Sequence, residues 1–279
     1  MKIKRIILFF TVFIALSQCK KEPEELYSDE NIVLDNAQAA LYFHTIFREA
    51  ENAWAFVNDK NYEAFTDIQT DPDKPASIYK KYTYSDKDII IDYHAWLTNH
   101  LILAGTIRVN FAINSYRSDG MVANVYLTDF SINGQDIKGN ATIKYKKNDN
   151  DQYEYKFFDG VIHEYGFTMP VLISGNITTS QYERIEGGET KLLQDDDVWA
   201  YSGTMTGMLH DDPKLNYTNK VLTSYIFENG ENGVIHFTMD KNCLTAKKGA
   251  SQITIPGRPD IIYGYFCSGV DFISVTTVH

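Results

Sequence analysis

The segment Ile132-Asn133-Gly134-Gln135 contains Asn-Gly, the strongest short signal for a β-hairpin, because both residues tolerate the positive φ that a tight two-residue turn requires. Before it, Val125 and Leu127 begin a short alternating run. After it, apolar side chains return at every second position, at Ala141, Ile143 and Tyr145. A period of two is typical of strands with one buried face. The segment therefore predicts two antiparallel strands joined by a tight turn.

The same alternation recurs along most of the chain from residue 89 onward. Apolar and polar positions alternate through residues 107–113, and Tyr153, Tyr155 and Phe157 follow a polar turn at residues 148–151. Further strands are expected at 221–227 and 235–239, with turns at 187–188, 228–233 and 256–257. Short strands joined by short turns predict an antiparallel meander or sandwich rather than βαβ units.

One helix is expected before this β region. Asp35 followed by Gln38 has the spacing of a capping box. Apolar residues then recur at steps of three and four, at Phe43, Ile46, Phe47, Ala50, Ala53, Trp54 and Val57, and residues 58–61 end the helix. The polar residues Gln38, Thr45, Arg48, Glu49 and Asn52 lie largely off this stripe. A second break is expected at residues 71–75, which contain two prolines. The predicted fold is mainly β (α+β), with one N-terminal amphipathic helix packed on the sheet.

The N-terminus has the order of a secretory signal. Basic residues Lys2, Lys4 and Arg5 precede an apolar run at 6–15, which is shorter than the roughly 20 residues of a transmembrane helix. The run closes with Leu16-Ser17-Gln18-Cys19, which resembles the lipobox of bacterial lipoproteins, although Gln18 departs from the usual small residue. The resemblance implies that Cys19 is acylated and becomes the first mature residue. The alternative is ordinary cleavage after the small-x-small sequence Ala15-Leu16-Ser17, which would release a soluble protein.

The residues after Cys19 are expected to form a tether. Residues 20–25 are charged, contain Pro23 and have nothing to bury. An acid-rich segment at this place resembles the surface-export signal of Bacteroidetes lipoproteins, which implies an outward-facing protein lipid-anchored in the outer membrane. The expected organisation is a signal peptide at 1–18, a lipidated flexible tether at 19–34, and a helix plus β-rich domain at 35–279.

Charge and composition restrict the partners. The formal net charge is −11, and loss of the three basic residues Lys2, Lys4 and Arg5 with the signal changes it to −14. An acidic chain without a basic stripe argues against nucleic acid and against binding to anionic headgroups, so the acyl chains would provide the membrane attachment. The chain contains 19 tyrosines and 16 phenylalanines, which suit pleated strands and could also form a platform for a sugar or a peptide.

Taken together, the helix and the long β region resemble a family of Bacteroidetes lipoproteins of unknown function. The resemblance covers the chain from about Asp35 to its end and rests on strand and turn segments at 89–93, 104–109, 127–139, 201–207 and 261–267, the last preceded by Cys243. It implies a helix followed by a Tyr/Thr/Asn/Gly-rich antiparallel β region. The family provides no catalytic residues to transfer to this chain.

With Cys19 assigned to lipid, two cysteines remain. Cys243 and Cys267 enclose two expected strands, so in an oxidising compartment they can form one disulfide. The alternative is two buried thiols. Neither cysteine has a His or Cys neighbour at metal-binding spacing, and no metal site or cofactor is expected.

Every catalytic motif is incomplete. His163-Glu164 begins like a zinc-protease motif, but Phe167 stands where the second His is needed. Ser77 and Lys80 match the Ser-x-x-Lys of penicillin-recognising enzymes without the accompanying Lys-Thr-Gly. Asp195-Asp196-Asp197 fits no calcium loop, and His94 and His100 near Trp96 have no motif around them.

The sequence therefore predicts a non-catalytic, outer-membrane-anchored lipoprotein that acts as a binding or envelope interaction module, with a glycan, a peptide or an envelope protein as its ligand. Two alternatives remain open. One is a carbohydrate- or peptide-binding surface protein with an aromatic groove. The other is a hydrolase that uses an unrecognised carboxylate pair or serine.

Overall fold

The computed structural model describes residues 29–60, 64–69, 78–85, 87–98, 101–113, 118–147, 152–163, 175–186, 198–208, 216–221, 235–238, 248–267 and 271–277. These residues form one long helix, α2 (Asp29–Lys60), and fourteen strands. The expected break at 71–75, the turns at 148–151, 187–188 and 228–233, and most of the expected strand at 221–227 lie outside these ranges.

The strands form one antiparallel sheet. Each strand pairs with the next in the chain from β1 to β10, the path continues through β12, β13 and β14, and β11 pairs with β9 and β12. The mainly β character and the antiparallel pairing are therefore confirmed. The bounds are β1 (Ala64–Gln69), β2 (Ile78–Ser85), β3 (Asp88–Thr98), β4 (Leu101–Ile113), β5 (Val122–Ile132), β6 (Gln135–Lys146), β7 (Gln152–His163), β8 (Gly175–Glu186), β9 (Val198–Met208), β10 (Asn216–Val221), β11 (Ile235–Thr238), β12 (Lys248–Thr254), β13 (Ile261–Cys267) and β14 (Asp271–Thr277).

The Asn-Gly hairpin is confirmed in detail. Ile132 of β5 lies opposite Gln135 of β6, and the two turn residues Asn133 and Gly134 have φ values of 53° and 78°. These are the two positive φ angles of a type I′ turn, whose twist matches that of the flanking strands. The expected alternation also holds in β4, where Ile107 and Val109 are buried and Arg108 between them is exposed.

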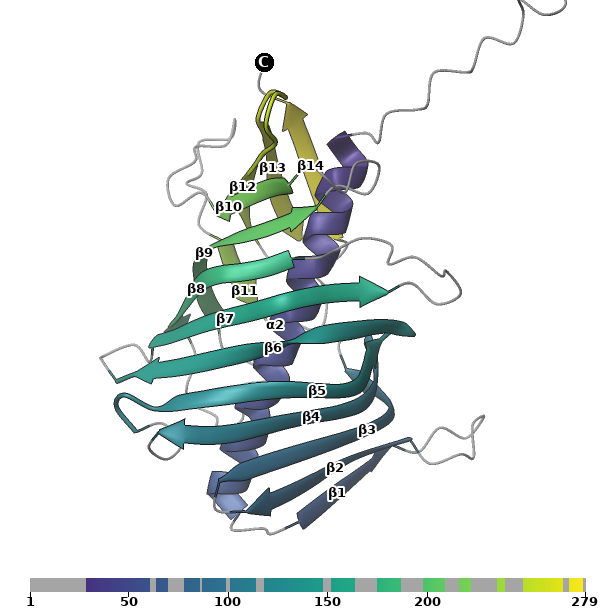
Figure 1. Ribbon diagram of the computed structural model, residues 1–279, viewed down its shortest axis with the longest axis vertical. Coiled ribbons are helices and arrows are strands. Elements are labelled where there is room, and N and C mark those ends of the chain that lie inside the picture. Colours follow the sequence, from purple (N-terminus) through teal and green to yellow (C-terminus); the bar gives the residue numbers. More distant parts are fainter. Residues whose placement is uncertain are drawn as a thin grey trace, which may run out of the picture.

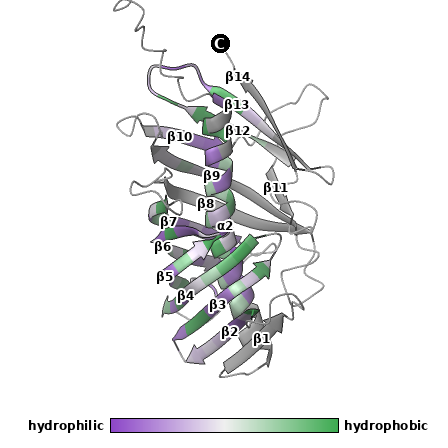
Figure 2. Cartoon of the chain, turned by 90° about the vertical axis from the view of Figure 1, so that its right-hand side faces the viewer, coloured by the Kyte–Doolittle hydropathy of each residue, from purple (hydrophilic) through white to green (hydrophobic). Residues whose placement is uncertain are grey.

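The helix lies along one face of the sheet, and the strands are stacked along its axis (Figure 1). Its N-terminal part lies beside β13 and β14, and its C-terminal end lies near β1 to β3 (Figure 1). Figure 2 shows that hydrophobic and hydrophilic residues are mixed along the same strands, as expected when one strand face is buried against the helix. No helix within the described residues has an apolar window sufficient to cross a bilayer.

The start of the helix differs from the prediction. Helix α2 begins at Asp29 rather than at the expected cap Asp35, so residues 29–34 are helical. The extra turns are stabilised by burial of Ile32 and Val33. Gln38, expected to cap the helix, instead donates from Nε2 to Oε1 of Gln135 at 2.7 Å. The end of the helix at Lys60 agrees with the prediction.

The core is formed between the apolar stripe of α2 and the inner face of the sheet. The ring of Phe43 stacks on that of Phe157 with centroids 4.4 Å apart, and Phe47 contacts the rings of Tyr153 and Tyr155. These rings are buried, and burying one large apolar side chain stabilises a fold by about 1.5–3 kcal/mol. The hydroxyl of Tyr155 donates to the backbone carbonyl of Phe43 at 3.0 Å, so the aromatic contact also contains a hydrogen bond.

Five residues with positive φ cross the sheet in a line. Ala95, Gly105, Asp129, Gly139 and Asp159 lie one in each of the strands β3 to β7, and the pairing register shifts at each of them. Bulges of this kind bend a strand and increase its twist. We call these five residues the bulge line. Because they lie in neighbouring strands, β3 to β7 bend at the same place, in the part of the sheet that packs against the middle of α2.

Candidate functional site

The outer face of the sheet, opposite α2, carries a row of exposed side chains. Strand pairing places Arg108 of β4 opposite Tyr126 of β5, Tyr126 opposite Asn140 of β6, and Asn140 opposite Phe158 of β7. Paired residues point to the same face of a sheet, and all four side chains are exposed. Tyr126 and Phe158 expose 41% and 43% of their surface, which is unusual for rings of this size. We call these four residues the aromatic row.

The spacing of the row follows from the sheet. Neighbouring strands lie about 4.8 Å apart, so the rings of Tyr126 and Phe158, two strands apart, are separated by about 10 Å. The amide of Asn140 lies between the two rings, and the guanidinium of Arg108 lies beyond Tyr126. The row therefore alternates stacking surfaces with hydrogen-bonding groups. Asn140 and Phe158 each directly adjoin a bulge-line residue, Gly139 and Asp159.

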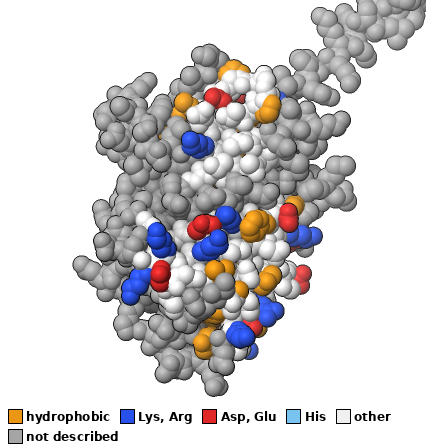
Figure 3. Space-filling model, turned by 60° about the vertical axis from the view of Figure 1, so that its left-hand side comes forward, with side chains coloured by type: hydrophobic (Ala, Val, Ile, Leu, Met, Phe, Trp, Pro, Cys, Tyr) orange, Lys and Arg blue, Asp and Glu red, His pale blue; other side chains and the backbone are white. Residues whose placement is uncertain are grey.

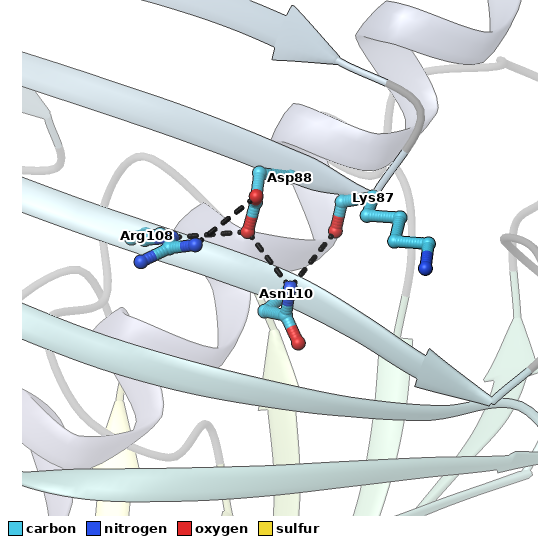
Figure 4. Close-up of polar contacts among 4 residues, drawn as sticks. All are labelled: Lys87, Asp88, Arg108 and Asn110. Atoms are coloured by element: carbon cyan, nitrogen blue, oxygen red, sulfur yellow. Dashed lines mark hydrogen bonds and ion pairs between the residues drawn. The ribbon is translucent and has the colours of Figure 1, made fainter.

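Arg108 is held in place by its neighbours, as Figure 4 shows. Its Nε and Nη2 atoms donate to Oδ1 and Oδ2 of Asp88 at 3.0 and 3.1 Å. The Nδ2 atom of Asn110 donates to the same carboxylate at 2.9 Å and approaches the carbonyl of Lys87 at 3.4 Å. The hydrogen bond from Arg108 lowers the pKa of Asp88, and Asp88 raises the pKa of Arg108. The pair is charged at neutral pH, and its opposite charges cancel beside the row.

Polar ladders flank the aromatic row. The hydroxyl of Thr106 donates to Asp92 at 2.8 Å, and Glu154 accepts ion pairs from Lys156 at 3.1 Å and Lys144 at 3.5 Å. The hydrogen bond from Lys156 contributes most to lowering the pKa of Glu154. Figure 3 shows positive, negative and hydrophobic side chains interspersed over the described surface in the lower half of the view. The surface around the row is therefore polar without being strongly charged in one sign.

On the inner face, a charged group is buried between sheet and helix. The Nζ atom of Lys80 donates to Oε2 of Glu49 at 2.5 Å, and the hydroxyl of Tyr93 donates to the same oxygen at 2.8 Å. The rings of Tyr82, Tyr93 and Trp96 lie 5.1, 5.4 and 5.9 Å from Nζ, within the range of cation–π attraction.

Burial opposes both charges of this pair, but each partner more than compensates for it. Lys80 lowers the pKa of Glu49, and Glu49 raises the pKa of Lys80. Burial and the adjacent carboxylate raise the pKa of Tyr93. The ion pair joins strand β2 to helix α2, and the hydroxyl of Tyr93 adds a contact from β3 to the same carboxylate.

The structure shows where the residues of the incomplete catalytic motifs lie. Lys80 of the Ser-x-x-Lys pattern lies in strand β2 and is paired with Glu49, whereas Ser77 lies outside the described residues. His94 is exposed and stacks on Tyr79 with ring centroids 5.3 Å apart. His163 ends β7, and His100, Glu164, Phe167 and Asp195 to Asp197 lie outside the described residues. Within the described part of the chain, no three His, Cys, Asp or Glu side chains are grouped to hold a metal.

The cysteine predictions stay predictions. Cys19 and Cys243 lie outside the described residues, and Cys267 is the last residue of β13, opposite Asp271 of β14.

The burial of polar residues of the helix was not predicted from the sequence. Thr45, Glu49 and Asn52, expected off the apolar stripe, are buried, as are His44 and Glu51. Glu51 accepts a hydrogen bond from the hydroxyl of Tyr153. Burial and the adjacent positive charge of Arg48 lower the pKa of His44 to about 3, so this imidazole is neutral at physiological pH. The only sequence signal was the density of tyrosines in the facing strands, since their hydroxyls can pair with buried polar groups.

Comparison with known proteins leaves the site to be interpreted from its own chemistry. No protein-family model, no curated protein and no solved structure matches this chain.

Proposed function

We propose that this chain is a non-catalytic binding module, anchored to the outer membrane through lipid on Cys19, and that the outer face of strands β4 to β7 is its binding surface. The observation that carries the proposal is the aromatic row. Two half-exposed rings lie in one line with a polar amide between them, and the adjacent arginine is fixed by two further side chains.

The orientation of the sheet supports this choice of surface. Its inner face is occupied by α2, and the buried aromatic residues there are used in packing. The outer face of an antiparallel sheet can remain solvated and is then open to a partner. Single exposed apolar residues need no functional explanation, but rings aligned with oriented hydrogen-bonding groups are the usual composition of a binding surface.

The anchor is tested by fractionation. Two or more acyl chains hold a protein firmly to a bilayer, so the wild-type protein is expected with the membranes and Cys19→Ala is expected in the soluble fraction or as an unprocessed precursor. Normal processing and unchanged membrane association of Cys19→Ala would contradict the lipoprotein assignment.

The binding surface is tested with the purified full-length protein in detergent. We expect it to bind isolated cell envelopes, and the double variant Tyr126→Ala/Phe158→Ala to lose that binding. The matched control is Tyr84→Ala/Leu97→Ala, which removes two exposed side chains of β2 and β3, outside the proposed surface. Equal envelope binding by wild type and the aromatic-row variant would show that the outer face is not the binding surface.

A further inference from the structure

We infer that the aromatic row is a site for a neutral glycan, which lies across strands β4 to β7 with sugar rings on Tyr126 and Phe158. This inference rests on the proposed function, since it names the ligand class of the same surface. The inference is based on the order of side chains along the aromatic row, in which a guanidinium, a ring, an amide and a second ring follow one another on paired strands.

The chemistry of a sugar matches this order. A pyranose ring presents an apolar face of C–H groups, edged by hydroxyls that both donate and accept hydrogen bonds. The negative face of an aromatic ring attracts such C–H groups, and Tyr126 and Phe158 both leave a large part of their surface open. The amide of Asn140 can donate and accept between them. Each ring therefore has a hydrogen-bonding neighbour within one strand spacing.

The site is partly organised before any ligand arrives. Two of the five N–H groups of Arg108 donate to Asp88, and the guanidinium is still half exposed, so its remaining donors are accessible to ligand hydroxyls. Asn110 holds the Asp88 carboxylate in turn. A side chain that is already oriented loses less conformational entropy when it binds.

The charges select among glycans. Asp88 cancels the charge of Arg108, and the other side chains of the row are a phenol, an amide and a phenyl ring. The chain as a whole is acidic, with a formal charge of −11. A polyanion would gain no net attraction at the row and would be repelled by the acidic chain as a whole. A neutral glycan is not repelled.

A peptide is a poorer occupant of the same face. Extended peptides usually bind a sheet by pairing with the free backbone groups of an edge strand. Strands β4 to β7 are interior strands whose ladder bonds go to their neighbours on both sides, so their backbone is already engaged. Only side chains are offered on this face, and they are arranged across the strands instead of along one of them.

The experiment titrates purified full-length protein with soluble β-glucan, mannan and xylan, with polygalacturonate as the polyanionic control, by isothermal calorimetry. We expect binding to at least one neutral glycan and none to polygalacturonate. Tyr126→Ala and Phe158→Ala should each weaken binding by about tenfold, since each removes one stacking contact. Tyr126→Phe should bind as the wild type does, and Leu97→Ala serves as the surface control.

A second readout does not depend on any variant. Nitration of tyrosines in the wild-type protein, mapped by mass spectrometry, should be reduced at Tyr126 when the glycan is present and unchanged at the exposed Tyr84. Binding of a neutral glycan without protection of Tyr126 would overturn the assignment of the site.

The outcomes separate this inference from the proposed function. If the aromatic-row variant loses envelope binding but no neutral glycan binds, the surface is correct, the glycan class is wrong, and the ligand is an envelope protein. If the variant keeps envelope binding, the proposed surface is itself wrong. Preferential binding of polygalacturonate would also refute the inference, because it contradicts the charge argument.

Discussion

The Nζ atom of Lys80 lies 2.5 Å from Oε2 of Glu49, and this ion pair between a strand and the helix is enclosed on all sides by protein. Tyr93 donates to the same carboxylate, and three aromatic rings surround the ammonium group. The pair fixes the C-terminal half of α2 against β2 and β3. Each charge depends on the other, because removal of one leaves an uncompensated charge away from water.

Glu49→Gln is therefore expected to lower the free energy of unfolding by about 3–5 kcal/mol, measured by urea denaturation at pH 7. The double variant Glu49→Gln/Lys80→Met should regain much of this loss, since it removes both charges. The matched control is Asp88→Asn, which breaks the solvent-exposed pair with Arg108 and should have a much smaller effect. Equal losses at the buried and the exposed pair would contradict this account.

His44 should make stability depend on pH in a defined window. Its pKa is about 3 in the folded protein and near the ordinary 6.5 when unfolded, so between these values only the unfolded chain binds the proton. Stability should thus fall as pH decreases from about 6.5, by at most about 1.4 kcal/mol per pH unit. Measurement between pH 5 and 6.5 avoids the range in which Glu49 titrates. His44→Gln should flatten this slope, and an unchanged slope would refute the assignment.

The bulge line gives a paired test of backbone strain. Gly105 has a φ of 92°, and a Cβ atom there would overlap the backbone carbonyl of Asp129, whereas Gly134 has a φ of 78° with open space around it. Gly134→Ala should cost about 1–2 kcal/mol through its φ alone. Gly105→Ala should cost about 3–5 kcal/mol, because a steric clash adds to the strain. Thermal melts that give the same loss for both variants would count against the close approach.

The disulfide between Cys243 and Cys267 is tested by mass. Alkylation of the unreduced, denatured protein followed by intact-mass analysis should find neither of these two thiols labelled. Reduction should then lower stability by about 3 kcal/mol if the bridge constrains the unfolded chain. Two labelled thiols before reduction would support the alternative of buried free cysteines.

Local features of the fold were readable from the sequence, because short-range rules specify them. The turn at Asn133-Gly134 could be predicted because both residues tolerate positive φ. The buried face of β4 could be predicted from the alternation of apolar and polar residues around Ile107. Strands β1 and β2 were missed. In β2, Lys80 takes an inward position that a pattern of alternating hydrophobicity assigns to an apolar residue.

The candidate site was less accessible to prediction because it depends on register across four strands. Arg108, Tyr126, Asn140 and Phe158 are separated by many residues, and they become neighbours only through pairing that includes register shifts at Asp129 and Gly139. A shift of one residue in any strand would turn its side chain to the opposite face. The start of the helix was missed for a similar reason: Ile32 and Val33 are stabilised by burial in the tertiary fold, whereas Asp35 offered only a local signal.

The helix also has a consequence for how the chain reaches its folded state. Asn36 donates to the hydroxyl of Tyr263 at 2.6 Å, across 227 positions of sequence, so an early turn of α2 is completed by one of the last strands. During synthesis the helix emerges before the strands that cover it, and its early turns are covered only once β13 has been made. Contacts of such long range slow folding. Aggregation is most favoured while the apolar stripe of α2 is exposed. The chain should therefore depend on chaperones until β13 has been synthesised and has packed against the helix.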